Sequence, residues 1–273
     1  MVEGRHAKYL DAPFTGSKMA AQDVRMLGTA IALLPRPGGG DDLVLAGHFT
    51  APTDFGDPPD APRLLQPGGF RDGFVLALRA DSGKTDWVTD VRDDSGADPH
   101  EASTVIGLAV TAKGELAFAG TDDDSVVVGA LAAADGALQG WAPRLSGDGA
   151  NVLPSAIAAS GDDLLVGWSS TKSYSQPYPP GNELFHLTRL VPDPAGGGAA
   201  QKVAWQKDYG PLENVVGWEG SFGLAVNQKT HNIALAGYFR TPSLTVVGGT
   251  LFDNPGGAGD PATVEAFLAS LGP

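Results

Sequence analysis

The side chains with the greatest capacity for chemistry in this sequence are carboxylates that gather in short runs. The stretches TDDDS (121–125) and DDSGAD (93–98) place hard oxygen ligands close together, as Ca²⁺ prefers. Neither stretch follows the twelve-residue calcium loop with its glycine and terminal glutamate. The sequence therefore predicts no cofactor, and calcium is only a weak alternative at Asp122, Asp123 and Asp124.

A second group of residues suits recognition better than catalysis. Tyrosine and tryptophan rings stack on flat apolar faces, while neighbouring polar groups bond hydroxyls or amides. On this basis we predict a ligand-binding surface formed by Trp218, Glu219, Tyr174, Tyr178, Asp54, Phe55, Arg71, Phe252, Asp253 and His100. The alternative is that the aspartates of this group serve only as turn formers.

Sequence signatures of catalysis are missing. The chain has no cysteine and no nucleophile elbow, phosphate-binding loop or dinucleotide fingerprint. Its histidines are scattered, and His48 occupies the same repeat position as Tyr238, which packing explains better than catalysis. We therefore expect no catalytic residues and a non-enzymatic protein. Hydrolysis of glycosides or peptides by paired loop carboxylates is the less favoured alternative.

Short strands must position these residues, because turn formers are abundant. The chain of 273 residues contains 38 glycines and 21 prolines, which favours many turns over long helices. Four apolar runs end at an equivalent glycine: Gly47, Gly120, Gly167 and Gly237. A tight polar turn separates each run from another apolar run upstream, a pattern typical of β-hairpins.

Further runs downstream complete a unit of four antiparallel strands. The first strands are expected at 28–35, 105–112, 153–160 and 221–228, and the second strands end at the four glycines. The third strands are expected at 72–80, 125–133, 183–191 and 264–272, and the fourth at 85–93, 139–147 and 203–210. Each fourth strand carries a tryptophan near its start (Trp87, Trp141 and Trp205), which we interpret as a packing anchor.

This repetition predicts an all-β fold, a single β-propeller domain over residues 1–273 with about four four-stranded blades. The blades are expected at about 24–93, 103–147, 152–210 and 220–273. The last unit lacks a fourth strand, so we expect residues 5–11 to pair with the C-terminal blade and close the ring. Four blades are few for a propeller, so a larger ring or two assembled chains are alternatives.

The units resemble a family of bacterial β-propeller repeats, the SBBP repeats. The resemblance rests on LAGHFT, TDFG and GGFRDGFVLALRADSGKTDW in the first unit and LAVTAKGELAFAG in the second. In the fourth unit it rests on LAGYFRTP and VVGGTLF, whereas the third unit departs with Gly167-Trp168-Ser169. The resemblance implies a propeller, an extracellular or surface location in bacteria, and no assigned chemistry.

Loop lengths indicate which end of the sheets carries the function. In a propeller of this strand order, the second-to-third and blade-to-blade connections emerge on one face. Most of these are long: 50–71, 169–182 and 240–263, with 12–27, 93–104 and 210–220. We predict a binding or assembly module that uses this long-loop face, with a carbohydrate or protein ligand. A structural subunit of a larger envelope or extracellular assembly is the alternative.

Net charge restricts the partners. Eighteen basic and thirty-two acidic residues give −14, which repels nucleic acid and anionic lipid. No run of about 18 apolar residues is present to span a membrane. We expect protein or glycan partners, with a homo-oligomer as an open alternative. The first fourteen residues lack the order of a signal peptide, so a secreted or cell-surface location requires that a leader was removed.

Overall fold

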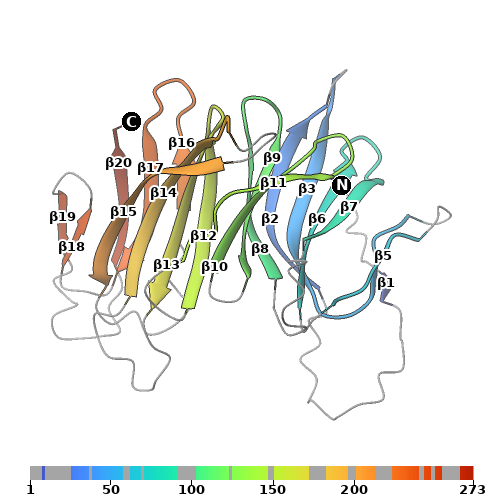
Figure 1. Ribbon diagram of the computed structural model, residues 1–273, viewed down its shortest axis with the longest axis horizontal. Coiled ribbons are helices and arrows are strands. Elements are labelled where there is room, and N and C mark those ends of the chain that lie inside the picture. Colours follow the sequence, from blue (N-terminus) through green and yellow to red (C-terminus); the bar gives the residue numbers. More distant parts are fainter. Residues whose placement is uncertain are drawn as a thin grey trace, which may run out of the picture.

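β-Strands are the regular elements that the computed structural model shows in its described residues, as predicted. Those residues are 8–9, 26–36, 39–57, 62–68, 71–91, 103–122, 125–146, 151–171, 183–195, 201–212, 223–239, 243–246, 250–253 and 265–272. Figure 1 shows the main sheets standing side by side, in chain order from the first at the right to the fourth at the left.

Three of the main sheets contain four antiparallel strands in chain order. The first joins β2 (Met26–Pro35), β3 (Asp41–Phe49), β6 (Asp72–Arg79) and β7 (Thr85–Val91). The second joins β8 (Ser103–Val110), β9 (Leu116–Asp122), β10 (Ser125–Leu131) and β11 (Leu138–Trp141). The third joins β12 (Asn151–Ser160), β13 (Asp163–Thr171), β14 (Glu183–Pro192) and β15 (Gln201–Leu212). The predicted four-strand unit is therefore confirmed three times.

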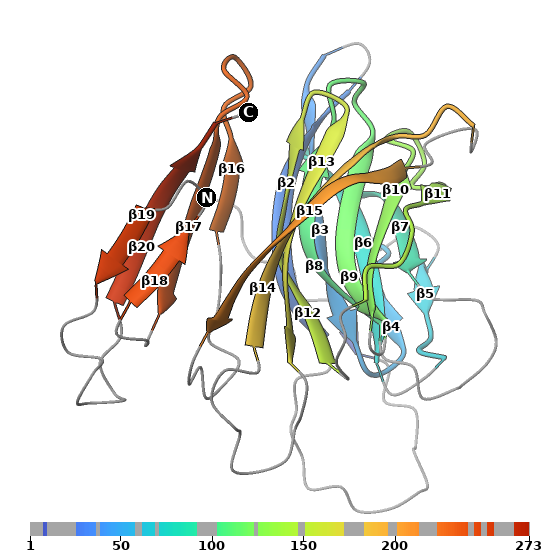
Figure 2. The ribbon, with the colours of Figure 1, turned by 60° about the vertical axis from the view of Figure 1, so that its left-hand side comes forward.

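The fourth sheet has three strands among the described residues. It joins β16 (Gly223–Val226), β17 (Ile233–Phe239) and β20 (Glu265–Leu271), in that order. A separate hairpin of β18 (Ser243–Val246) and β19 (Thr250–Asp253) lies in the chain between β17 and β20. In Figure 2 the fourth sheet stands at the left and the outer strands of the first sheet at the right.

The N-terminal strand does not pair as predicted. β1 (Lys8–Tyr9) pairs with β4 (Thr53–Asp54), which also pairs with β5 (Leu64–Leu65), and not with the C-terminal sheet. The expected ring closure by this segment is therefore wrong for its described residues. The physical reason is that β4 presents a strand edge whose backbone groups would otherwise lack partners, and β1 supplies them.

Consecutive sheets pack face to face through their first strands. β2 contacts β8, β8 contacts β12, and β12 contacts β16. One apolar cluster fills each of the three spaces between the sheets. These clusters form a layered core in which every internal sheet is covered on both faces.

The first three sheets follow a small-against-large rule at their interfaces. Ala46 of β3 packs in the same cluster as Phe118 of β9, which points back at the first sheet. The next residue, Ala119, points the other way and packs in the cluster that contains Val166 of β13. Because side chains alternate along a strand, Ala46 and Ala119 face the following sheet, whereas Phe118 faces the preceding one. The third sheet differs, because it turns Leu165, Phe185 and Leu187 to the fourth sheet.

A β-bulge in the first strand explains why two of the repeated glycines are needed, and it shows that the third, Gly167, was aligned wrongly. In the first two sheets the bulge of the first strand lies opposite Gly47 and Gly120. A Cβ at Gly47 would lie 1.9 Å from the Leu27 carbonyl oxygen, so no larger residue fits there. In the third sheet Trp168 pairs at the corresponding place, one residue beyond Gly167. The predicted alignment of that unit was therefore wrong by one residue.

Candidate functional site

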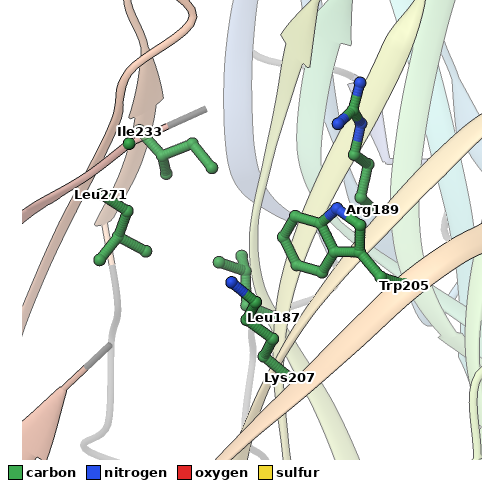
Figure 3. Close-up of a pocket in the computed structure, with 7 residues that line it drawn as sticks. Leu187, Arg189, Trp205, Lys207, Ile233 and Leu271 are labelled. Carbon is green, nitrogen blue, oxygen red and sulfur yellow. The ribbon is translucent and has the colours of Figure 1, made fainter. Parts of the chain in front are cut away.

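A pocket of about 130 Å³ lies between the third and fourth sheets, near the turns that connect β14 to β15 and β16 to β17. Its lining residues are Leu187, Arg189, Trp205, Lys207, Ile233, Leu271 and Gly272. Figure 3 shows the Trp205 ring, Lys207 and Arg189 on the third sheet, with Ile233 and Leu271 across the space on the fourth sheet.

The register of β14 and β15 brings the polar part of the pocket together. Arg189 lies opposite Trp205, and Leu187 lies opposite Lys207. Directly opposed residues of an antiparallel pair project from the same face, so all four face the fourth sheet. On that sheet Ile233 pairs with Leu271, and both side chains are buried. The pocket thus has an apolar floor beneath one aromatic ring and two cations.

The two cations differ in their partners. Arg189 donates hydrogen bonds from Nε and Nη2 to Asp163 Oδ2, at 3.0 and 2.5 Å, and its side chain is 40% exposed. Lys207 Nζ lies 5.1 Å from the centre of the Trp205 ring, a cation–π geometry. Within the described part of the chain no carboxylate forms an ion pair with Lys207. The contact that the structure describes for the Lys207 ammonium group is therefore the Trp205 ring.

The pocket lies between the third and fourth sheets. The equivalent position between the first and second sheets is closed. There Trp87 lies opposite Ala77, as Trp205 lies opposite Arg189. Trp87 is buried, and its Nε1 donates a 3.1 Å hydrogen bond to the carbonyl of Ala133, in the turn between β10 and β11. Trp205 is only partly buried, because no described turn of the fourth sheet covers it.

A second polar constellation lies on the opposite face of the third sheet. The Ser170 hydroxyl bonds Nε2 of His186 at 2.8 Å, and Nδ1 of His186 bonds Oδ1 of Asp208 at 2.7 Å. The three residues come from β13, β14 and β15. This order of contacts is that of the serine–histidine–aspartate triad of hydrolases.

The surroundings of this triad indicate a stabilising role. Ser170 and His186 are buried within regular strands, and the imidazole stacks on the buried Trp168 ring at 3.9 Å. Trp168 Nε1 donates to Thr188 Oγ1 at 3.0 Å, so polar groups form a bonded network around the indole. Because Trp168 packs against the second sheet, the network satisfies polar atoms inside an interface, as burial requires.

Asp208 connects this network to solvent. Burial alone would raise the pKa of Asp208, but hydrogen bonds from His186 and Gln206 outweigh that effect and hold the pKa below its usual value. Gln206 Nε2 donates to Asp208 Oδ1 at 2.9 Å, and the carboxylate is 54% exposed. Asp208 therefore stays ionised and fixes the imidazole in place.

Three residues of the predicted binding surface have structural partners. Asp54 Oδ1 accepts hydrogen bonds from the backbone N–H groups of Gly56 and Arg63, at 2.8 and 2.9 Å. Phe55 is buried and packs its ring against other phenylalanines of the first sheet. Arg71 lies beside buried His48; burial first and the Arg71 charge second lower the pKa of His48 to about 4. Phe55 therefore packs its described segment against the first sheet, and Asp54 bonds that segment to Arg63.

The remaining predicted residues are not tested by the described structure. Outside the described residues lie Trp218, Glu219, Tyr174, Tyr178, His100, Asp123 and Asp124. Phe252 and Asp253 belong to β19, but their side chains are not described. Asp122 forms an ion pair with Arg144. Among the residues that the structure describes, no group of three or more histidines and carboxylates is placed to hold a metal.

Sequence reasoning missed the pocket because it interpreted Trp205 only as a packing anchor. A signal was nevertheless present in the alignment of the units. Arg189 stands where the first sheet has Ala77, and Lys207 stands where it has Thr89. A long cation at a position that faces a neighbouring sheet breaks the repeat, and such breaks indicate local function.

Comparison with known proteins gives no indication of function, so the proposal below is based on the geometry of the site. No protein-family model matches the chain, and no curated protein matches it. Among the described residues, no helix has the length and apolar character needed to cross a membrane.

Proposed function

We propose that this chain is a non-enzymatic binding module of the β-propeller class, and that the pocket around Trp205 binds an acidic carbohydrate. The single observation that carries the proposal is the half-buried Trp205 ring between two cations, in a chain with a net charge of −14. The propeller class is supported by the repeated strand order and by the resemblance to SBBP repeats. The same resemblance supports a surface or extracellular location.

The ligand class follows from the chemistry of the lining. An indole ring offers a flat face to the C–H side of a sugar ring, and Lys207 and Arg189 offer N–H donors to a carboxylate or sulfate. The pocket is smaller than the roughly 300–1,000 Å³ of typical small-molecule sites, so it suits one terminal sugar unit. A neutral sugar would offer no negative charge to the Lys207 ammonium.

Binding to uronic-acid and sulfated oligosaccharides tests the proposal, by glycan array followed by titration calorimetry at two salt concentrations. We expect salt-sensitive binding that falls at least tenfold in Trp205→Ala and in Lys207→Gln. Lys202→Gln is the matched control, because Lys202 lies on the same strand, 53% exposed, and outside the pocket. Equal binding by all three variants, or no binding of any acidic glycan, would refute the site.

A further inference from the structure

The two ends of the row of sheets expose apolar faces. The corresponding faces of the other sheets are buried at the internal interfaces. On the first sheet, Ile31 and Leu33 of β2 are 64% and 60% exposed. On the fourth sheet, Leu268 of β20 is 71% exposed. We call these the first-sheet end face and the fourth-sheet end face. No other main sheet of the described structure packs on either face.

The first-sheet end face corresponds to a face that is covered in the second sheet. Ile31 lies opposite Leu45 in the first sheet, and Leu108 lies opposite Phe118 at the same place in the second. Phe118 is fully buried there, in the cluster shared with the first sheet. The first-sheet end face therefore carries the side chains with which a sheet packs on a preceding one.

The fourth-sheet end face corresponds to the opposite kind of face. Leu268 lies opposite Ala236, as Val75 lies opposite Ala46 in the first sheet. Val75 is fully buried where the second sheet packs on it. The first sheet offers Ala46 and its neighbour Val75 to the second sheet at this place, so the fourth-sheet end face matches there a face on which a following sheet packs.

We propose that the fourth-sheet end face of one copy of this chain packs on the first-sheet end face of a second copy. Every chain carries both faces, and the pair repeats the small-against-large packing seen between the first and second sheets. The β4–β5 hairpin covers part of the first sheet through Phe55, but it leaves Ile31 and Leu33 on β2 open.

Two copies joined in this way leave no end face uncovered. Each contributes four main sheets, so two contacts between unlike faces close a ring of eight. Contacts between unlike faces close into rings when the rotation between copies permits it, and eight blades lie within the usual range of propellers. This inference does not depend on the Trp205 pocket.

Native mass spectrometry and light scattering of the full chain test the proposal. We expect a mass of two chains for the unaltered protein. Ile31→Asp and Leu268→Asp should each give single chains, because each variant spoils both contacts of the ring. Leu138→Asp is the control: Leu138 is 46% exposed but belongs to β11, away from both end faces, and its variant should remain paired.

Mixing the two variants gives the sharpest result. The Ile31→Asp copy keeps a sound fourth-sheet end face, and the Leu268→Asp copy keeps a sound first-sheet end face. One intact contact should therefore form between them and restore a mass of two chains. Circular dichroism of each variant confirms that it is folded, and Leu33→Ser replaces Ile31→Asp if it is not. A single chain in the unaltered protein, larger assemblies, no recovery on mixing, or equal disruption by Leu138→Asp would overturn the proposal.

Discussion

Two tryptophans at the same position in the repeat have different surroundings. Trp87 on the first sheet is 4% exposed, and the turn between β10 and β11 closes over it. Trp205 on the third sheet lies at the corresponding place but lines a pocket. The comparison shows that the same side chain is buried where a turn of the next sheet covers it, and lines an open pocket where no described turn does.

The residues around each tryptophan reinforce the difference. Beside Trp87 the strand partner is Ala77, and Thr89 Oγ1 donates a 2.7 Å hydrogen bond to the carbonyl of Gly136. Beside Trp205 the strand partner is Arg189, a much longer side chain than Ala77, which is paired with Asp163 and is still 40% exposed. The third and fourth sheets therefore stay apart at this point, whereas the first and second close.

The largest expected effect compares the two tryptophans directly. Trp87→Ala should lower the free energy of unfolding by about 3–5 kcal/mol, because it leaves a cavity in a closed interface. Trp205→Ala should lower it by about 1 kcal/mol or less, since that ring is already partly exposed. Urea denaturation followed by circular dichroism measures both. Equal losses would mean that the two interfaces are equally closed.

A smaller effect tests the turn that covers Trp87. Gly136 has a φ of +71°, and a Cβ there would lie 2.4 Å from Cε3 of Trp87. Gly114 has a φ of +80° with nothing within 4 Å, so Gly114→Ala should cost only the backbone strain, about 1–2 kcal/mol. Gly136→Ala should cost about 1–3 kcal/mol more because of the clash. Thermal unfolding compares the two variants, and equal shifts in Tm would show that the turn does not press on Trp87.

Acid should weaken the first and third sheets in different pH ranges. His48 in the first sheet has a pKa of about 4, against 6.5 when exposed, so between these values only the unfolded chain binds the proton. The free energy of unfolding should therefore fall as the pH drops from 6.5 to 4. Asp208 in the third sheet has a lowered pKa, so its contribution is complete above 3.8 and is lost only at lower pH.

Substitution of the histidine separates these two ranges. His48→Gln should flatten the pH dependence between 6.5 and 4, as measured by urea denaturation at several pH values. His231→Asn is the control, because His231 is exposed and asparagine tolerates its positive φ of 58°. A slope that survives His48→Gln would assign the acid sensitivity to another group.

The smallest effect on stability is expected at the pocket itself. Arg189→Ala removes an ion pair with Asp163 whose arginine is 40% exposed, so the free energy of unfolding should change by about 1 kcal/mol or less. The proposed acidic ligand should nevertheless bind more weakly, as measured by calorimetry. A large loss of stability would instead make Arg189 part of a closed interface, like Ala77.

The local sequence pattern was sufficient to predict the strands, but it was not sufficient to predict their bulges or all of their pairing partners. The strands that end near Gly47 and Gly120 were predicted correctly because alternating apolar residues and turn residues lie only a few positions apart in the sequence. The one-residue shift at Trp168 was missed because a bulge depends on the partner strand. The pairing of Lys8–Tyr9 was wrong for the same reason, since many exposed edges can accept a short strand.

The candidate site was less predictable than the fold. Arg189, Trp205 and Lys207 come from two strands, and their shared face follows from the register between those strands. Whether that face is open depends on the next sheet, which is distant in sequence. The triad of Ser170, His186 and Asp208 was missed because its members lie on three strands, with no short motif to mark them.

The sequence by itself determined that this chain forms repeated antiparallel sheets and roughly where most of their strands lie along the chain. Those properties depend on neighbours a few positions apart, through alternation and turn conformation. Only the tertiary structure decided which tryptophan is covered, which cations line the pocket beside Trp205 and which sheet faces are exposed. These depend on packing between sheets, and packing is set by residues that are far apart along the chain.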